Sequence, residues 1–390
     1  MKIVGKENSS LGRVITRVVL LILLAGLLVF MLIFPQVLIS ENVANYYSGK
    51  VFPVIAFLRN TIFSSLPVSV TEFLVVVGSL ALILIVVYNI VKLVKIRNTK
   101  GVRAFFKRLC TTLTCVLIIA SVLALDFQLM HGINYRRTDA ATRLGLVTRQ
   151  RSVEEMQEAL FWAYENMVQA RSMLGEDYTG ASHMMSSFDE AALYADELVS
   201  RFSNFTGLEM SRNFVRAKPV AISDLWIYTN IVGVYDPFLG EANINVDRIS
   251  PTDMPTTMCH EVAHAKGYGR EYDCDLIAVL SCCMASRADF RYCGYLAAFE
   301  EILSIMPNVG EYMWLFSSEE FQPVARDMNA DEAYFLSLTD NVITQAVATV
   351  SEDVNDSYLE ANGQEGGTLT YLENSNYYVE FYFTYVKGEV

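Results

Sequence analysis

A short run of polar residues on an apolar segment carries the clearest chemical signal in the chain. His260, Glu261 and His264 form an H-E-x-x-H motif within residues 257–265. Histidines four residues apart lie on one side of a helix, so both can bind the same metal ion, and Glu261 falls beside it. This spacing is typical of zinc sites in which the glutamate takes a proton from water. A chance match is the alternative, but unligated polar groups would be poorly solvated on such a helix.

A catalytic zinc ion usually has a third protein ligand and one position open to water. The metzincin pattern would place a third histidine six residues after His264, where this chain has Arg270. The next predicted helix instead offers two carboxylates, Glu271 and Asp273, and the spacing alone leaves both open as ligands. This segment is similar to one in glutamate-type membrane zinc peptidases. That resemblance implies that Glu271 binds the metal and that Asp275 orients the first histidine.

Two further pairs of residues are candidates for substrate contacts. Asn243 and Asn245 lie just before the motif helix, where zincin-type peptidases carry an edge strand that pairs with an extended substrate. Tyr292 and Tyr295 follow the motif and could donate a hydrogen bond to the oxyanion that develops during peptide hydrolysis. The simpler alternatives are a structural strand for the asparagines and core packing for the tyrosines, of which the chain has 21.

Three long apolar runs occupy the first third of the chain, at about residues 18–39, 73–91 and 109–130. Each is close to the roughly 20 helical residues needed to cross a bilayer. We therefore predict a membrane anchor of three transmembrane helices over residues 1–130. A signal peptide is the alternative for the first run, but that run is longer than the apolar part of a signal peptide, which has about 7–15 residues.

The Lys and Arg residues of the anchor predict its orientation. Basic connections stay in the cytoplasm, so residues 131–390 are expected outside the cytoplasmic membrane. The formal net charge of −13, with a basic anchor, makes the outer domain acidic. This disfavours nucleic acid as a partner and leaves the lipid bilayer and an envelope substrate. The basic residues are at the N-terminus, Lys2, Lys6, Arg13 and Arg17, and between the second and third runs, Lys92, Lys95, Arg97, Lys100, Arg103, Lys107 and Arg108.

The outer domain is predicted to be mainly α-helical with a small sheet (α+β). Residues 218–255 are rich in β-branched and aromatic residues broken by glycine and proline, which favours a short hairpin or edge strand. Five cysteines cluster in the domain, and their odd number and short spacing favour small buried side chains over a disulfide framework. Apolar residues recur at helical spacing in 153–173, 189–202, 258–266, 270–286, 294–306 and 331–350.

Several segments together resemble a family of bacterial membrane proteins known as domain of unknown function 3810. The resemblance lies in the three apolar runs, in the H-E-x-x-H region and in residues 132–136, 237–245 and 355–359. After the second histidine the family pattern reads approximately G-x-x-R-E-x-E-A-N. Here Asp273 replaces a glutamate, which favours the longer Glu271 as the ligand. The family implies a zincin-like zinc peptidase fold but no established substrate.

These observations predict a membrane-anchored zinc metallopeptidase that cleaves peptide bonds of a peptide or protein in the envelope. His260, His264 and Glu271 would hold Zn²⁺, which lowers the pKa of water toward about 7, and Glu261 would act as general base. Two other functions stay open at this point. One is a zinc-binding scaffold or sensor without proteolysis, which would not need Glu261. The other is a metal-dependent hydrolase of a non-peptide envelope substrate.

Overall fold

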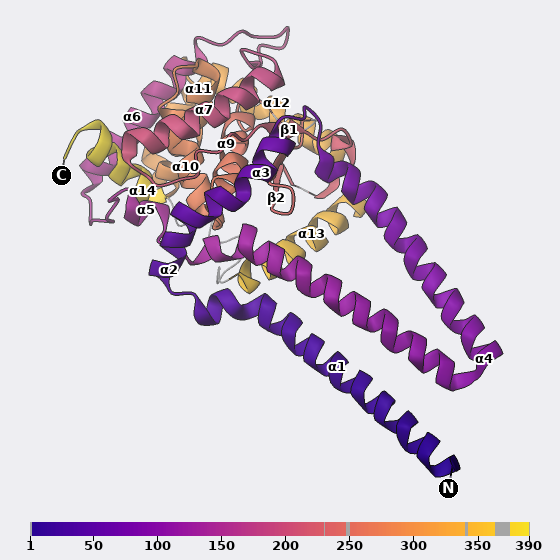
Figure 1. The fold of residues 1–390 in the computed structure, drawn as a ribbon. Coiled ribbons are helices and arrows are strands. Elements are labelled where there is room, and N and C mark those ends of the chain that lie inside the picture. The colour runs from indigo at the N-terminus through magenta and orange to yellow at the C-terminus, as the bar shows by residue number, and fades with distance from the viewer. Residues whose placement is uncertain (1, 230, 247–249, 340–341, 363–374, 390) are drawn as a thin grey trace.

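The computed structural model describes residues 2–229, 231–246, 250–339, 342–362 and 375–389. Most of these residues are helical and a few form short strands, which confirms the predicted mainly helical character with a small sheet. Packed helices and strands form one end of the molecule, and long helices project from it in one direction (Figure 1).

Two projecting helices are long and apolar enough to cross a membrane, α1 (Lys2–Leu38) and α4 (Val70–Met130). The sequence predicted three such helices, and the structure corrects this number to two. The predicted spans 73–91 and 109–130 both lie in α4, whose 61 residues are interrupted at Gly101, where φ is 77° and ψ is 176°. The chain turns back there, so α4 is a hairpin of two helical arms (Figure 1).

The basic connection between the two predicted spans is helical rather than a loop, and for this reason the two spans form one element. Glycine adopts positive φ without a steric penalty, so Gly101 reverses the chain with no intervening loop. A straight helix of 61 residues would be about 90 Å long, three times the roughly 30 Å thickness of a bilayer core.

Short helices connect α1 to α4 and lie across the domain ends of these long helices (Figure 1). They are α2 (Glu41–Tyr46), the π-helical η1 (Tyr47–Val51) and α3 (Phe52–Ser64). In α3 the buried side chains are at positions 52, 56, 60 and 64, a spacing that marks one helix face. This face packs against the helical domain, where the ring of Phe52 lies beside Gly267.

The helices of the domain lie close to where the sequence predicts them. α6 (Val153–Arg171) and α7 (Phe188–Thr206) each begin with a capping box, in which a serine and a glutamate bind backbone N–H groups of the first turn. The predicted helix at 331–350 is instead divided between two helices. The other helices are η2 (Gly132–Arg136), α5 (Ala140–Arg143), α8 (Ser223–Trp226), η3 (Ile227–Thr229), α9 (Met254–Ala265), α10 (Glu271–Cys283), α11 (Ala288–Ser304), η4 (Val309–Tyr312), η5 (Leu315–Ser317), α12 (Gln322–Thr339), α13 (Val342–Ala361), α14 (Ser375–Phe381) and η7 (Tyr382–Val386).

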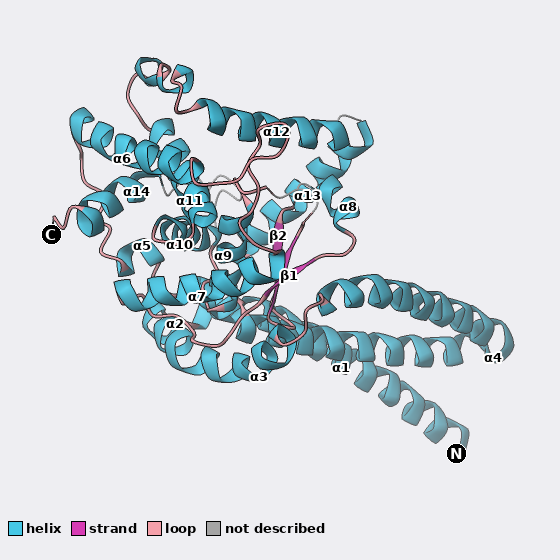
Figure 2. Ribbon diagram, turned by 90° about the horizontal axis from the view of Figure 1, so that it is seen from above, coloured by secondary structure: helices cyan, strands magenta, loops and turns pink. Residues whose placement is uncertain are grey.

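A three-stranded sheet lies beside α9 (Figure 2). Its strands are β1 (Ala217–Pro219), β2 (Gly233–Asp236) and β3 (Glu241–Ile244), in the order β1-β3-β2. The antiparallel pair β2–β3 confirms the predicted hairpin, while β1 pairs with β3 in parallel. The segment predicted as an edge strand is therefore the central strand, because a three-residue strand that carries no distinct sequence signal adds to its outer side.

Helix α9 occupies the centre of the domain. The helices α7, α10 and α11 and the sheet pack against it. The apolar side chains of α9, such as Met258 and Val262, are fully buried in a continuous core. The cysteines of the domain are small buried side chains, as the sequence predicts: Cys259, Cys274, Cys282, Cys283 and Cys293. The H-E-x-x-H helix is therefore held in place from several sides.

Candidate metal centre

Two consecutive helices carry the predicted metal ligands. Helix α9 holds His260 and His264 one turn apart, and α10 begins with Glu271, a few residues after α9 ends. The two helices pack against each other, so the start of α10 lies beside the end of α9. Local chain geometry is therefore sufficient to bring the three side chains together.

The three donor atoms form a compact triangle. The Nε2 atoms of His260 and His264 lie 3.0 Å apart, and Glu271 Oε2 lies 3.0 Å from the first and 3.3 Å from the second. Zinc binds nitrogen and oxygen at about 2.0–2.2 Å, so donors around one tetrahedral ion are about 3.3 Å apart. The donor set fits Zn²⁺ in chemical type and in size.

Each candidate histidine ligand is oriented by an acceptor on its other nitrogen. His260 Nδ1 lies 2.6 Å from Asp275 Oδ1, and His264 Nδ1 lies 2.9 Å from the main-chain oxygen of Tyr268. Such contacts fix the ring and its tautomer, with Nε2 left for the metal. Asp275 thus contacts the first histidine, as the resemblance to glutamate-type zinc peptidases implies.

The charges of the cluster are complementary. Burial alone would lower the pKa of His260, but Asp275 and Glu271 raise it well above its ordinary value. Burial alone would raise the pKa of Glu271, but His264 and His260 hold it well below its usual range. The carboxylate is therefore ionised, and binding of a divalent cation would displace protons from the histidines.

Cys274 offers a different third donor, because its sulfur could join His260 and His264 in a metal site. The sulfur lies 3.2 Å from His264 Nδ1, the nitrogen that already faces the Tyr268 carbonyl. Burial also raises the pKa of the Cys274 thiol well above its ordinary value, which disfavours the thiolate that binds metals. We therefore favour Glu271, which lies on the Nε2 side of both histidines.

Asp273, the alternative ligand, faces away from the histidines. It is buried, and its Oδ1 accepts a hydrogen bond of 2.6 Å from the backbone N–H of Ala140 at the start of α5. Burial raises its pKa to about 6. Two residues correspond to a rotation of about 200° around a helix, so Glu271 and Asp273 cannot face α9 together.

Glu261 lies beside the cluster as a buried carboxylate. Its Oε2 has no hydrogen-bond partner among the described residues, and burial raises its pKa to about 7. An unpaired buried carboxylate is rare in native proteins and indicates a catalytic role or a bound water or ion. The side chain packs against Gly233 of β2, where an added Cβ would lie 2.5 Å from Glu261 Oε1.

A third histidine and two tyrosines surround the cluster, and the sequence analysis missed them. The ring of His131 lies 5.5 Å from that of His264, and its Nε2 lies 3.2 Å from the Tyr135 hydroxyl. Tyr135 in turn donates a hydrogen bond of 3.3 Å to the hydroxyl of Tyr358. Burial lowers the pKa of His131 to about 3, so this histidine is neutral. The sequence did contain one signal for this site. The chain has only four histidines, and His131 directly follows an apolar run.

The two predicted asparagines do not reach the metal ligands. Asn243 Oδ1 accepts a hydrogen bond of 2.7 Å from Ser69, the residue that caps the start of α4. Asn245 donates to the main-chain oxygen of Ile231 at 3.3 Å. Asn243 therefore fastens the sheet to the start of α4, and Asn245 holds the segment before β2, as the structural alternative proposed.

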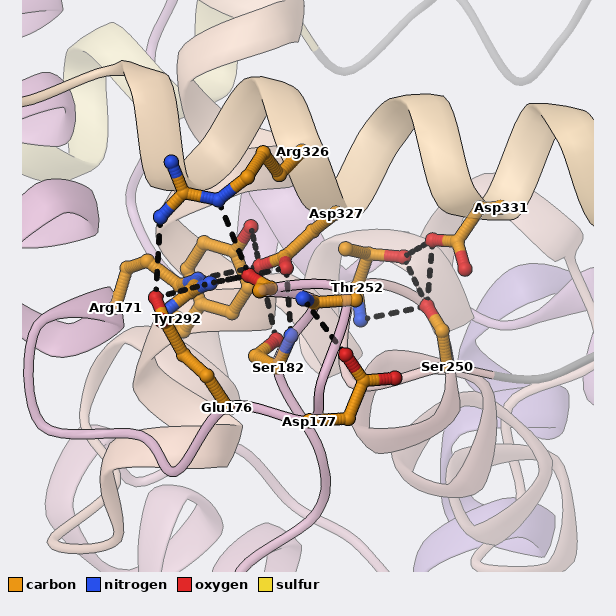
Figure 3. A network of polar contacts seen from close by, with 12 residues as sticks. Arg171, Glu176, Asp177, Ser182, Ser250, Thr252, Tyr292, Arg326, Asp327 and Asp331 are labelled. Carbon is orange, nitrogen blue, oxygen red and sulfur yellow. Dashed lines mark hydrogen bonds and ion pairs between the residues drawn. The ribbon is translucent and has the colours of Figure 1, made fainter.

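The two predicted tyrosines also lie elsewhere. Tyr292 is fully buried and donates a hydrogen bond of 2.9 Å to Asp327, which also binds Arg171 (Figure 3). The ring of Tyr295 packs edge-on against Trp162 at 5.2 Å. The two tyrosines join α11 to α12 and α6, as the alternative of core packing expects.

The strand beside Glu261 is β2, and it is an edge strand of the sheet. The backbone N–H of Asn245 donates to the oxygen of Val232, which makes these two residues a hydrogen-bonded pair. Such pairs alternate along antiparallel strands. The N–H and C=O groups of Gly233 and Tyr235 therefore point away from β3, toward the side of β2 on which no described strand pairs with it.

The contact between β2 and Glu261 gives a first prediction. In Gly233→Ala the new methyl group would push Glu261 aside, and a displacement of about 1 Å costs on the order of 100-fold in rate. We expect this loss in peptide cleavage by the purified protein, with its zinc content unchanged. Gly310→Ala is the control, because an added Cβ there meets no atom within 4 Å. Full activity of Gly233→Ala would contradict the role assigned to this contact.

Comparison with known proteins gives one match. A family model described as a protein of unknown function matches residues 47–378, from η1 to α14. The matched part includes α4, the candidate metal ligands and the residues that surround them. No curated protein and no solved structure matches the chain. The chain therefore belongs to the family of unknown function DUF3810.

Proposed function

We propose that the chain is a membrane-anchored zinc metallopeptidase with a zincin-like domain that hydrolyses peptide bonds outside the cytoplasmic membrane. The observation that carries this proposal is the triangle of His260, His264 and Glu271 donor atoms at 3.0–3.3 Å. The buried Oε2 of Glu261 beside it has no hydrogen-bond partner among the described residues, which supports catalysis rather than binding alone.

The residues of the cluster have separate tasks. His260, His264 and Glu271 would hold Zn²⁺, which when bound supplies the Lewis acidity that polarises a carbonyl group and acidifies water. Glu261 takes a proton from the attacking water and returns it to the leaving amine, and a pKa of about 7 suits both transfers near neutral pH. The outward N–H and C=O groups of Gly233 and Tyr235 would pair with an extended substrate and hold it beside Glu261.

We also propose that α1 and both arms of α4 cross the membrane. In the most apolar 18-residue stretch of each helix, only 6% (α1) and 0% (α4) of the stretch is buried. Such exposure of apolar side chains is costly in water and favourable in lipid. Each arm of α4 would be roughly 45 Å long, sufficient for one crossing. The Lys and Arg residues around Gly101 favour a cytoplasmic position for the tip of the hairpin and an outside position for the domain.

This orientation gives a second prediction. A reporter enzyme that is active only outside the cytoplasm should be active when fused after Val390 and inactive when fused near Thr99, at the tip of α4. A reporter that is active only in the cytoplasm, fused at the same positions, should give the opposite pattern. Activity of the outside reporter at Thr99 together with inactivity at Val390 would place the metal cluster in the cytoplasm.

The assignment of the ligands gives a third prediction. We expect Glu271→Ala to lose most of its zinc, because one of three donors is removed, and Asp275→Ala to bind zinc about 10–100-fold more weakly. Asp273→Asn is the matched control, since its oxygen can still accept from Ala140. The measurement is the metal content of the purified full chain and its zinc affinity in competition with a chelator. Zinc loss in Asp273→Asn but not in Glu271→Ala would show that the ligand is misassigned.

A further inference from the structure

The metal cluster lies directly beyond the end of a projecting helix. α4 ends at Met130, and the ring of the next residue, His131, lies 5.5 Å from the ring of His264. The last exposed large apolar side chain of α4 is that of Leu125, which precedes His131 by about 9 Å along the helix axis. The metal ligands are therefore within about 15 Å of the apolar surface of α4.

Helix α3 presents apolar side chains away from the protein. The face opposite its buried one is 50–73% exposed at Val54, Phe57, Leu58 and Ile62. The polar Asn60 is buried instead, which is the reverse of the pattern in a helix that faces water. Exposed Leu66 and Val68 continue this apolar surface to the start of α4. Because α3 lies across the domain ends of α1 and α4 (Figure 1), its exposed apolar face adjoins the projecting helices.

Helix α13 has a second exposed apolar stripe that leads to the metal cluster. Val347, Val350 and Val354 are exposed at helical spacing. One turn further, Tyr358 binds Tyr135 through its hydroxyl, and its ring lies 6.2 Å from the ring of Phe127 in α4. This ring contact places the C-terminal part of α13 beside the end of α4.

The edge strand β2 runs from the cluster toward the projecting helices. It begins at Gly233, which contacts Glu261. It ends at Asp236, whose carboxylate accepts a hydrogen bond of 2.9 Å from Thr71 in the first turn of α4. A chain paired along β2 would thus extend from the metal cluster to the base of the hairpin.

The outer leaflet of the bilayer is the occupant that fits these apolar surfaces, because they continue the surface of helices that we propose to cross it. Helices with such a face lie about 5–10 Å deep in the boundary between headgroups and acyl chains. We propose that the site works at the membrane surface on membrane-anchored polypeptides, and this rests on the proposed function. About 15 Å corresponds to roughly five extended residues, and a path twice as long still places cleavage within about ten residues of the substrate's span.

Mapping of cleavage sites tests the substrate class. New protein N-termini are labelled and identified in membranes that carry the full chain, either unaltered or as Glu261→Gln. We expect the sites lost in the variant to lie outside the membrane and within about ten residues of a transmembrane segment. Lost sites in soluble envelope proteins, or far from any span, would overturn this inference and leave the peptidase standing. Identical N-termini in both samples would instead overturn the proposed function.

A second measurement locates α3 without using activity. The full chain is placed in vesicles of phosphatidylethanolamine and phosphatidylglycerol whose acyl chains carry bromine, which quenches tryptophan fluorescence on contact. We expect the added fluorescence of Leu58→Trp to be quenched. Leu193→Trp is the matched control, since Leu193 is a similarly exposed leucine on α7, within the domain. Absence of quenching in Leu58→Trp, or equal quenching in both variants, would overturn the placement of α3 in the leaflet.

Discussion

Glu261→Gln should retain zinc and lose peptide cleavage by about 10²–10⁴-fold, the usual contribution of a general base. The amide has almost the shape of the carboxylate but cannot accept a proton from water. Its buried Oε2 has no hydrogen-bond partner among the described residues, so the exchange breaks no described contact of that atom. Cleavage rate, metal content and thermal unfolding would be measured on the same purified full chain.

The control for this variant is Glu165→Gln, which changes an exposed glutamate on α6. It should match the unaltered protein in all three measurements. Unchanged function of Glu261→Gln with zinc retained would mean that the site binds without catalysis, in favour of a scaffold or sensor. If Glu261→Gln instead stops the formation of a hydrolysis product that is not a peptide, the chain is a hydrolase of a non-peptide envelope substrate.

Glu241→Gln should destabilise the protein by about 3–5 kcal/mol, the usual cost of leaving one buried charge unpaired. Lys218 and Glu241 form an ion pair in which both side chains are fully buried. Glu241 also accepts a hydrogen bond of 2.7 Å from the backbone N–H of Thr71 in α4. Removal of the Glu241 charge therefore weakens both the sheet and its connection to α4.

Thermal unfolding of the full chain in detergent micelles would measure this effect, as a fall in Tm on the order of 10 °C. Glu197→Gln is the matched control, because Glu197 forms an exposed pair with Arg201 on α7 at 3.6 Å. Pairs of this kind contribute about 0–1 kcal/mol. A similar Tm for both variants would contradict the role given to the buried pair.

Much of the candidate metal centre could be predicted because it is local in sequence. His260, His264, Glu271 and Asp275 lie on two consecutive helices, and helix geometry largely determines which of their side chains can meet. The choice between Glu271 and Asp273 follows from the same geometry once the phase of α10 is known. That phase depends on packing, so the spacing alone left both open.

The surroundings of the cluster depend on contacts between distant parts of the chain. His131 directly follows α4, Gly233 lies in β2 and Tyr358 lies in α13, and no local pattern relates them to the motif. The same holds for β3, which becomes a central strand only when β1 adds to it. Tyr292 could not be placed either, since its partner Asp327 lies in a different helix.

The packing of α3 and α4 against the domain has a consequence for studies of the protein in isolation. Ser69 and Thr71 bind the sheet, and Phe52 covers the link between α9 and α10. A fragment that starts after Met130 would expose each of these surfaces to water, including the buried carboxylate of Glu241. Soluble expression of residues 131–390 alone is therefore a poor route to the folded domain, and detergent or lipid belongs in its preparation from the start.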